Sequence, residues 1–354
     1  MKKIFLLCFF FLHLHNLYAQ KIDATIIHAM ETAIQNETYP NIHSVLISYK
    51  GNLIYENYWA GKDFKNGKHV GVVAHGKDSL HSIQSVSKSI VSACIGIALK
   101  QGNIKSINQR AFEFLPEYKT LDTGLKKAIT IKDLLTMTAG FQWDEQDYSK
   151  IGNSAHVMDS SSDPLAYVLS LPMAFFPGKT FTYNSGATEI LAAILQKATR
   201  KTIDVFAREY LFTPLDINNF KWANCTGSNV INAFGGLYMK PEDMLKFGLL
   251  YLHDGKFGSK QIIPTSWVRQ SITPHIKTHD IYGDDYGFQW WLCIDTIIKK
   301  PVSIPACSGT GGQYILVDKA NSLVVVITAG NYRKHDYSFD VFKDFIYPAL
   351  FKKE

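Results

Sequence analysis

The sequence predicts an α+β fold: one antiparallel β-sheet is built from the N- and C-terminal segments, flanked by helices, and carries an inserted, mostly helical region. Three observations predict it. Strand patterns occur near both ends of the chain, at 44–58 and at 287–328. Helical patterns dominate between them, from 130 to about 272. A long apolar segment, from Ser85 to Lys100, reads as a buried central helix. Strands from both termini can form a single sheet with the helical region inserted between them.

The first nineteen residues are typical of a secretory signal peptide. Lys2 and Lys3 form a positive start, residues 4–14 are apolar, and Ala19 is a small residue suited to cleavage. The apolar run is short for a bilayer span, and the alternative is an uncleaved anchor. We therefore expect export to the periplasm or the extracellular space, cleavage near Ala19, and no membrane span in the mature chain.

We predict two domains after the signal peptide. Residues 20–115 and 282–354 form the sheet domain, and residues 116–281 form the helical domain. The first strands form a hairpin at 44–58, because Gly51-Asn52 is a turn signal between two alternating runs. Helices are expected at 131–137, 163–171, 187–199, 202–211 and 241–253, later strands at 287–293, 313–317 and 322–328, and a closing helix at 340–351.

Composition and charge exclude several classes of protein. The formal net charge is +6, but the positive residues are scattered, so no nucleic-acid or membrane-surface partner is expected. Four cysteines follow the signal peptide: Cys94 is expected in the buried helix, Cys225 has no assigned role, and Cys293 and Cys307 either form a bridge or stay free. The histidines are dispersed and no metal-ligand spacing is present, so neither a metal site nor a cofactor is expected. The sequence does not determine the oligomeric state.

The tetrad Ser85-Val86-Ser87-Lys88 is an S-x-x-K pattern at the start of the central helix. Residues three apart lie on one helix face, so Lys88 can reach the Ser85 hydroxyl. The backbone N–H of a serine at a helix N-terminus is unbonded within the helix and can stabilise an oxyanion. Burial lowers the pKa of a lysine, which suits proton transfer. The alternative is a serine-rich helix cap beside a solvated lysine.

Two further segments contain groups that acyl transfer needs. Tyr183-Asn184-Ser185-Gly186 precedes an apolar helix, and its tyrosine is a candidate proton acceptor for the serine. Ser308-Gly309-Thr310-Gly311-Gly312 precedes a strand, and its glycines allow a substrate to lie along the backbone. Taken alone, the first segment also fits a turn and the second a loop or bulge. Trp290 and Trp291 could wall the site or belong to the core.

Together these segments resemble the serine β-lactamase and penicillin-binding-protein superfamily, and most closely its class C β-lactamase-like esterases and 6-aminohexanoate-dimer hydrolases. The resemblance covers nearly the whole mature chain. It extends to the segments at 51–56, 131–140, 234–244 and 286–291.

The resemblance implies a role for each segment. Ser85 is the nucleophile, Lys88 its partner and Tyr183 the general base, while the backbone N–H groups of Ser85 and Gly312 form the oxyanion hole. Ser185, Gly309, Thr310 and Gly311 are expected to bind substrate. Two departures stand out: Ser185 occupies the usual asparagine place of Y-x-N, and Gly309 the basic place of K-T-G. The missing cation argues against a substrate that needs its carboxylate recognised.

We therefore expect a secreted serine hydrolase that cleaves a small ester or amide through an acyl-enzyme on Ser85. The alternatives are a β-lactamase or D-amino-acid peptidase, and a non-catalytic acyl-binding or sensor module on the same fold. The natural substrate, the preference for ester or amide, and the base for deacylation stay open.

Overall fold

The computed structural model describes residues 22–65, 68–148, 150–280, 283–297, 300–332 and 334–352. The predicted signal peptide and its cleavage position near Ala19 lie outside these residues. Within the described part of the chain, none of the helices is both long and apolar enough to cross a membrane.

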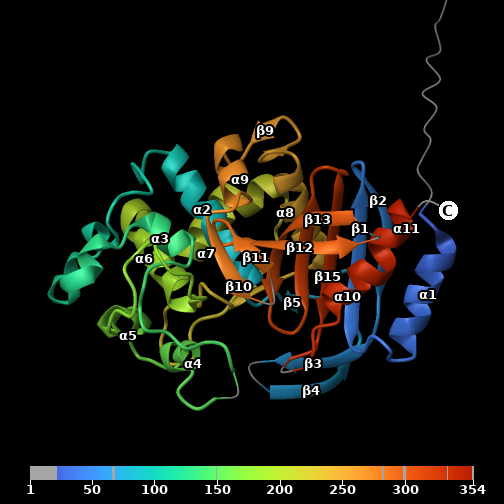
Figure 1. Cartoon of the computed structure of the whole chain (residues 1–354), viewed down its shortest axis with the longest axis horizontal. Helices are drawn as coiled ribbons and strands as arrows, with labels where there is room; N and C mark the ends of the chain where they lie inside the picture. Colours follow the sequence, from blue (N-terminus) through green and yellow to red (C-terminus); the bar gives the residue numbers. More distant parts are fainter. Residues whose placement is uncertain are drawn as a thin grey trace, which may run out of the picture.

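An eight-stranded antiparallel sheet forms the centre of the molecule (Figure 1). Strands from both ends of the chain lie next to each other in it, since β1 pairs with β15 from Ile42↔Ala329 to Tyr49↔Leu323. The α+β fold predicted from the sequence is thus confirmed. In spatial order the strands are β10 (Ile276–Asp280), β11 (Gly283–Tyr286), β12 (Trp291–Ile297), β13 (Lys300–Gly309), β14 (Gln313–Asp318), β15 (Leu323–Ala329), β1 (Ile42–Tyr49) and β2 (Asn52–Tyr58).

The middle strands are buried along their whole length, which explains their continuous apolar runs. Helix α8 (Pro241–Leu252) packs on β14, β15 and β1. Its Gly248 permits a close approach, because a Cβ there would lie 2.5 Å from Val324 Cγ1. A second group of helices flanks the β1–β2 end (Figure 1): α1 (Ala24–Gln35), α10 (Ser338–Val341), η6 (Phe342–Ile346) and α11 (Tyr347–Phe351).

The central helix α2 (Val86–Lys100) begins directly after Ser85, and its residues Val86–Ala98 are all buried. It contacts the sheet at β13 and β14 and the helical region at α6 and α7. The prediction of a buried helix between the two parts of the molecule is confirmed. This position explains the apolar sequence, because α2 has neighbours on every side.

The helical region lies on one side of the sheet, in the green and yellow part of Figure 1. Side chains cap its helices: Thr130 accepts from the Asp133 N–H at the start of α3, and Asn184 accepts from the Ala187 N–H at the start of α6. Its helices are α3 (Ile131–Leu135), α4 (Ser154–Asp159), α5 (Pro164–Ser170), α6 (Ser185–Thr199), α7 (Ile203–Ala207) and α9 (Thr265–Ser271). Short turns of helix are η1 (Ala111–Phe114), η2 (Pro116–Leu121), η3 (Gly124–Ala128), η4 (Arg208–Phe212) and η5 (Thr213–Leu215).

Small sheets complete the fold. They pair β3 (Gly61–Lys65) with β4 (Lys68–Val73), β7 (Leu237–Met239) with both β5 (His81–Ser82) and β6 (Lys221–Trp222), and β8 (Lys256–Phe257) with β9 (Lys260–Gln261). The β5–β7 pair matters for the site, because β5 leads directly to Ser85.

One sequence-based expectation differs from the structure, and the structure adds detail on two others. The strand predicted at 287–293 is a turn up to residue 290, closed by the Gly287 N–H donating to Trp290 O at 2.8 Å. Strand β10 belongs to the large sheet although it lies in the range predicted for the helical domain; the domain boundary itself stays a prediction. Cys293 pairs in register with Ile304 and Cys307 with Ile315, so the two cysteines are not opposite each other, and no disulfide joins them.

Candidate active site

Ser85 and Lys88 are joined by a hydrogen bond at the start of α2. Lys88 Nζ donates to Ser85 Oγ at 2.8 Å and to the backbone oxygen of Phe234 at 3.0 Å. Ser85 is half-buried and lines a cavity, whereas Lys88 is 1% exposed. The i,i+3 spacing therefore places the amine directly behind the hydroxyl that a substrate would meet.

The environment of Lys88 favours the neutral amine. Burial lowers the pKa of Lys88 from 10.5 to about 8, and the negative charge of Glu145 acts in the opposite direction. A neutral amine can accept a proton from Ser85, whereas an ammonium cannot. At neutral to mildly basic pH a useful fraction of Lys88 is therefore able to act as a base.

The backbone just before Ser85 is strained. Gln84 has φ +48°, a left-handed conformation that costs a non-glycine residue about 1 kcal/mol or more. Its side chain donates from Nε2 to Ser82 Oγ at 2.8 Å, which holds it in place. This bend turns the chain from β5 into α2 and orients Ser85 toward the cavity.

Tyr183 lies beside this pair. Its ring centroid is 5.0 Å from Lys88 Nζ, and the ring stacks on Trp291 with centroids 5.4 Å apart and planes at 25°. Tyr183 and Trp291 both line the cavity of Ser85. Trp290, in contrast, is fully buried against Phe247 and Tyr251, so only one of the two tryptophans walls the site.

The end of β13 forms another wall, where Ser308 to Gly311 line the cavity. Gly309 packs against the segment that leads to Ser85, and a Cβ there would lie 2.5 Å from the Ile83 carbonyl oxygen. This close contact requires glycine and leaves no room for a basic side chain at 309.

The backbone N–H of Gly312, the expected second oxyanion donor, does not point into the cavity as a free donor. The Gly312 N–H donates to Gly309 O at 3.2 Å within the β13–β14 turn, so it is already used. Among the described residues, no acceptor takes the backbone N–H of Ser85 or of Thr310. Thr310 lines the cavity, whereas Gly312 does not. These two N–H groups are therefore the candidate pair.

Ser185 is not at the cavity surface. It is 1% exposed, and its Oγ donates to Glu145 Oε1 at 2.5 Å while its backbone N–H donates to Glu145 Oε2 at 2.8 Å. The same carboxylate accepts from Trp143 Nε1 at 2.7 Å and from the Tyr148 hydroxyl at 2.6 Å. Glu145 thus ties the segment 143–148 to the start of α6, two residues after Tyr183.

Sequence reasoning missed Glu145. It accepts from Ser185 and its charge acts on Lys88, both far from it in the sequence, and a single acidic residue in a polar loop does not indicate such contacts. The one local feature that could have indicated a buried carboxylate is the pair of aromatic donors beside it, Trp143 and Tyr148.

The cavity has a volume of about 850 Å³, which suits a small molecule. Its ionisable lining contains four acidic residues, Asp144, Glu145, Asp147 and Asp336, but only one lysine, Lys334, and one histidine, His279. Asp144 is paired with Lys150. Burial raises the pKa of Asp336. The charge of the lining therefore does not favour an anionic ligand.

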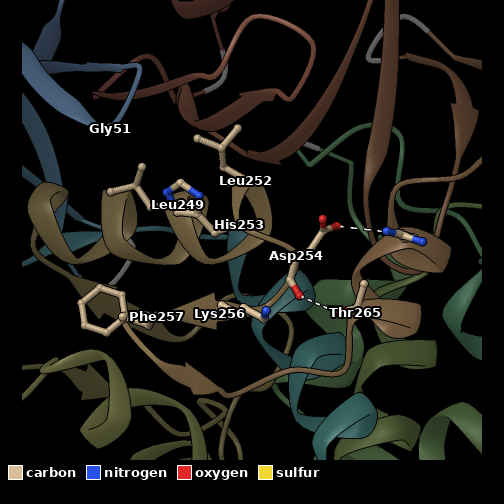
Figure 2. A pocket seen from close by; sticks show the side chains of 10 residues that line it. Gly51, Leu249, Leu252, His253, Asp254, Lys256, Phe257 and Thr265 are labelled. Carbon is tan, nitrogen blue, oxygen red and sulfur yellow. Dashed lines mark hydrogen bonds and ion pairs between the residues drawn. The ribbon is translucent and has the colours of Figure 1, made fainter. Parts of the chain in front are cut away.

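A second cavity, of about 800 Å³, lies near the end of α8 (Figure 2). Its Asp254 accepts from Lys319 Nζ at 2.8 Å and lies 3.8 Å from Arg269 Nε, so its charge is balanced. Its lining residues include no hydroxyl next to a buried amine, and this cavity offers no counterpart of the Ser85–Lys88 pair.

The three comparisons with known proteins agree with this geometry. Residues 42–340 match the Beta-lactamase family. The chain belongs to that family. The match includes Ser85, Lys88, Tyr183 and the end of β13, so every cavity wall described above lies within it. The family contains hydrolases, esterases, amidases and penicillin-binding-protein homologues, which makes the chain a protein of the serine-hydrolase type of fold.

Individual relatives of the chain are distant. A 6-aminohexanoate-dimer hydrolase of Paenarthrobacter ureafaciens is 24% identical over 267 residues, which are 70% of this chain and 66% of that protein. The hydrolase EstCE1, described as having promiscuous acyltransferase activity, superimposes with a TM-score of 0.74 at 16% identity, over 93% of this chain and 99% of the other. An octameric penicillin-binding protein homologue from Pyrococcus abyssi has a TM-score of 0.71 at 16% identity, covering 93% and 78%. At these identities the structures show the shared fold alone.

Proposed function

We propose that this member of the Beta-lactamase family is an exported serine hydrolase that cleaves small esters or amides through an acyl-enzyme on Ser85. The observation that carries the proposal is the 2.8 Å hydrogen bond between Lys88 Nζ and Ser85 Oγ in the wall of a cavity. Export rests on the N-terminal sequence and stays a prediction.

The chemistry follows from the positions of the groups. Neutral Lys88, assisted by Tyr183, accepts the Ser85 proton as Oγ attacks the substrate carbonyl. The N–H groups of Ser85 and Thr310 stabilise the resulting oxyanion. The bond between the carbonyl carbon and the leaving oxygen or nitrogen then breaks, and the accepted proton passes to the leaving alcohol or amine. Water attacks the acyl-enzyme in the second half of the reaction and releases the acid and free Ser85.

The residues that line the cavity favour the binding of an uncharged or weakly charged substrate. No basic side chain fits at Gly309, and the acidic residues outnumber Lys334. A carboxylate-bearing substrate would therefore lack a charge-assisted hydrogen bond at the end of β13. The stacked rings of Tyr183 and Trp291 provide an apolar surface for an acyl chain or a small leaving group.

Labelling combined with turnover tests the proposal. A fluorophosphonate should label the wild-type protein at Ser85, and short p-nitrophenyl esters should be hydrolysed; Ser85→Ala should lose both while keeping the wild-type circular dichroism spectrum. Because nucleophile and base act as a unit, the loss in kcat should exceed about a hundredfold. Retention of more than about a tenth of wild-type kcat by pure Ser85→Ala would contradict the assignment. Labelling without turnover would instead support a non-catalytic acyl-binding module.

A further inference from the structure

Three histidines that are far apart in the sequence lie together on the sheet side of the nucleophile segment. His43 comes from β1, His75 from the loop after β4, and His81 from β5. Each offers a ring nitrogen, and these three nitrogens all lie within 4.8 Å of one another. The separation of the histidines in the sequence argued against a metal site, but these three lie close together in the fold. The cluster is separate from the catalytic cavity, whose lining contains none of the three.

The hydrogen bonds of the cluster leave nitrogens without partners. His81 Nδ1 lies 3.0 Å from the Ser82 carbonyl oxygen, so it carries the hydrogen and His81 Nε2 presents a lone pair. His43 Nδ1 lies 2.8 Å from that Nε2 and donates to it. Among the described residues, neither the buried His43 Nε2 nor the buried His75 Nε2 makes a hydrogen bond of normal geometry. The Lys62 backbone lies close to the fully buried His43 ring. Unpaired buried polar atoms are costly, and two of them in one cluster need an explanation.

The cluster is electrostatically suited to a cation. Neutral imidazole is a common ligand of transition-metal ions. The negative charge of Asp63, on strand β3, acts on His75 and His81 and favours a bound cation.

We propose that His43, His75 and His81 bind one divalent transition-metal ion of the Zn²⁺ type, with water in the remaining position. Zinc bonds imidazole nitrogen at about 2.0–2.1 Å, so the nitrogens of a tetrahedral site are about 3.3 Å apart. The nitrogens here are separated by 2.8 Å in the closest pair and lie within 4.8 Å overall, a range that includes this spacing. Small ring movements are sufficient to form the site.

Two adjustments accompany binding. His43 and His75 are stacked, with centroids 3.8 Å apart and planes at 15°, and stacked rings cannot both direct in-plane lone pairs at one ion. His75 must therefore turn, which its half-buried position on a loop allows. The proton of His43 Nδ1 must move to Nε2, where the Lys62 carbonyl is the neighbouring acceptor. The ion then takes the place of the shared proton, and no net proton is released.

The location indicates a structural role for the ion. His81 precedes Ser85 by only four residues, and β5 has a single pairing partner, β7. An ion held by β1, the His75 loop and β5 would attach this short strand to the large sheet. A ligand that binds only the folded protein raises its thermal midpoint in a concentration-dependent way.

Metal titration of the mature full-length protein, first treated with a chelator, tests the proposal. Isothermal titration with ZnCl₂ should show one saturable site, and Co²⁺ should give the visible absorption of a four-coordinate complex. His75→Phe preserves ring stacking and removes one ligand, so affinity should fall at least about tenfold. The matched control is His253→Phe, a single exposed histidine near the end of α8, which should bind like wild type.

Thermal melting gives an independent readout. Zn²⁺ should raise the Tm of wild type and of His253→Phe, and should leave the Tm of folded His75→Phe unchanged. Absence of saturable binding to wild type, or equal binding by wild type and His75→Phe, would overturn the proposal; the second result would show adventitious surface binding. Neither outcome affects the assignment of Ser85, because ester turnover is not used as the readout.

Discussion

At the scale of single residues, the decisive feature is a lysine that is kept neutral by its surroundings. Within the described part of the chain, the hydrogen-bond partners of Lys88 are a hydroxyl and a carbonyl, and neither compensates for the loss of water around a full charge. The i,i+3 pattern indicates contact with Ser85, but the degree of burial comes from α6, α7 and the sheet packing around α2.

The pH dependence of turnover should reflect this lysine. Because burial lowers the pKa of Lys88 to about 8, the neutral base is populated above pH 8 instead of only above 10.5. We expect kcat/KM for a neutral ester to rise about tenfold per pH unit below pH 8 and to level off above it. A profile measured between pH 5.5 and 9.5 checks this, and a flat profile below pH 7.5 would show that Lys88 is not the titrating base.

Tyr183 is expected to act on the proton and not on substrate binding. Tyr183→Phe keeps the stacking on Trp291 and removes only the hydroxyl, so kcat should fall by about a hundredfold or more while KM changes little. Steady-state kinetics with one p-nitrophenyl ester separates the two parameters. A raised KM at unchanged kcat would make Tyr183 a binding residue and leave Lys88 as the only base.

At the scale of elements, Glu145 connects the loop 143–148 to α6. Its two oxygens accept four hydrogen bonds, and a glutamine amide cannot accept all of them. Glu145→Gln should lower the free energy of unfolding by about 1–3 kcal/mol. It also removes a charge that raises the pKa of Lys88, so the midpoint of the pH profile should move below about 8.

A second buried glutamate in α6 is the matched control for that prediction. Burial raises the pKa of Glu189 to about 8, so it is largely protonated at neutral pH, and glutamine replaces a neutral group there. Glu189→Gln should leave the midpoint of the activity profile in place. If both variants shifted the midpoint equally, or if neither did, the charge of Glu145 would not be what acts on Lys88.

The contact between β13 and the nucleophile segment gives another prediction at this scale. Gly309→Ala places a Cβ 2.5 Å from the Ile83 carbonyl oxygen, so the two segments must separate. We expect a loss of about 1–3 kcal/mol in the free energy of unfolding together with a lower kcat. Gly76→Ala is the control, because a Cβ at Gly76 would contact nothing within 4 Å. Urea unfolding and ester kinetics of both variants measure the effect, and a Gly309→Ala variant as stable as Gly76→Ala would contradict it.

At the scale of the whole molecule, the sheet, α2 and the helical region together form one cavity with a mostly acidic lining. Without a cation at the end of β13, carboxylate-bearing substrates lose a hydrogen bond worth about 1.5–3 kcal/mol. Short neutral esters should therefore be turned over at least about tenfold faster in kcat/KM than nitrocefin. Spectrophotometric assays of both substrates on one preparation decide this, with Ser85→Ala as the background; nitrocefin turnover as fast as the best ester would favour a β-lactamase.

Features that depend on local pattern could be predicted from the sequence. The hairpin at 44–58, the buried helix after Ser85 and the Ser85–Lys88 pair were predictable, because strand alternation, turn residues and i,i+3 spacing act over a few residues. Most helices of the inserted region were also predicted, with ends shifted by a few residues, since capping sets the ends. Tyr183 was predictable as a residue of a motif, although its distance from Lys88 was not.

Features that depend on segments far apart in the chain became visible in the folded structure. Glu145 accepts a hydrogen bond from Ser185, forty residues later in the sequence. Thr310 replaces Gly312 as the candidate oxyanion donor, because the Gly312 N–H already donates to Gly309 O within a turn. The pairing of β1 with β15 determines where His43 lies relative to His75 and His81. Such contacts depend on strand register and helix packing, which arise from the burial of the whole apolar core and leave no mark on any short stretch of sequence.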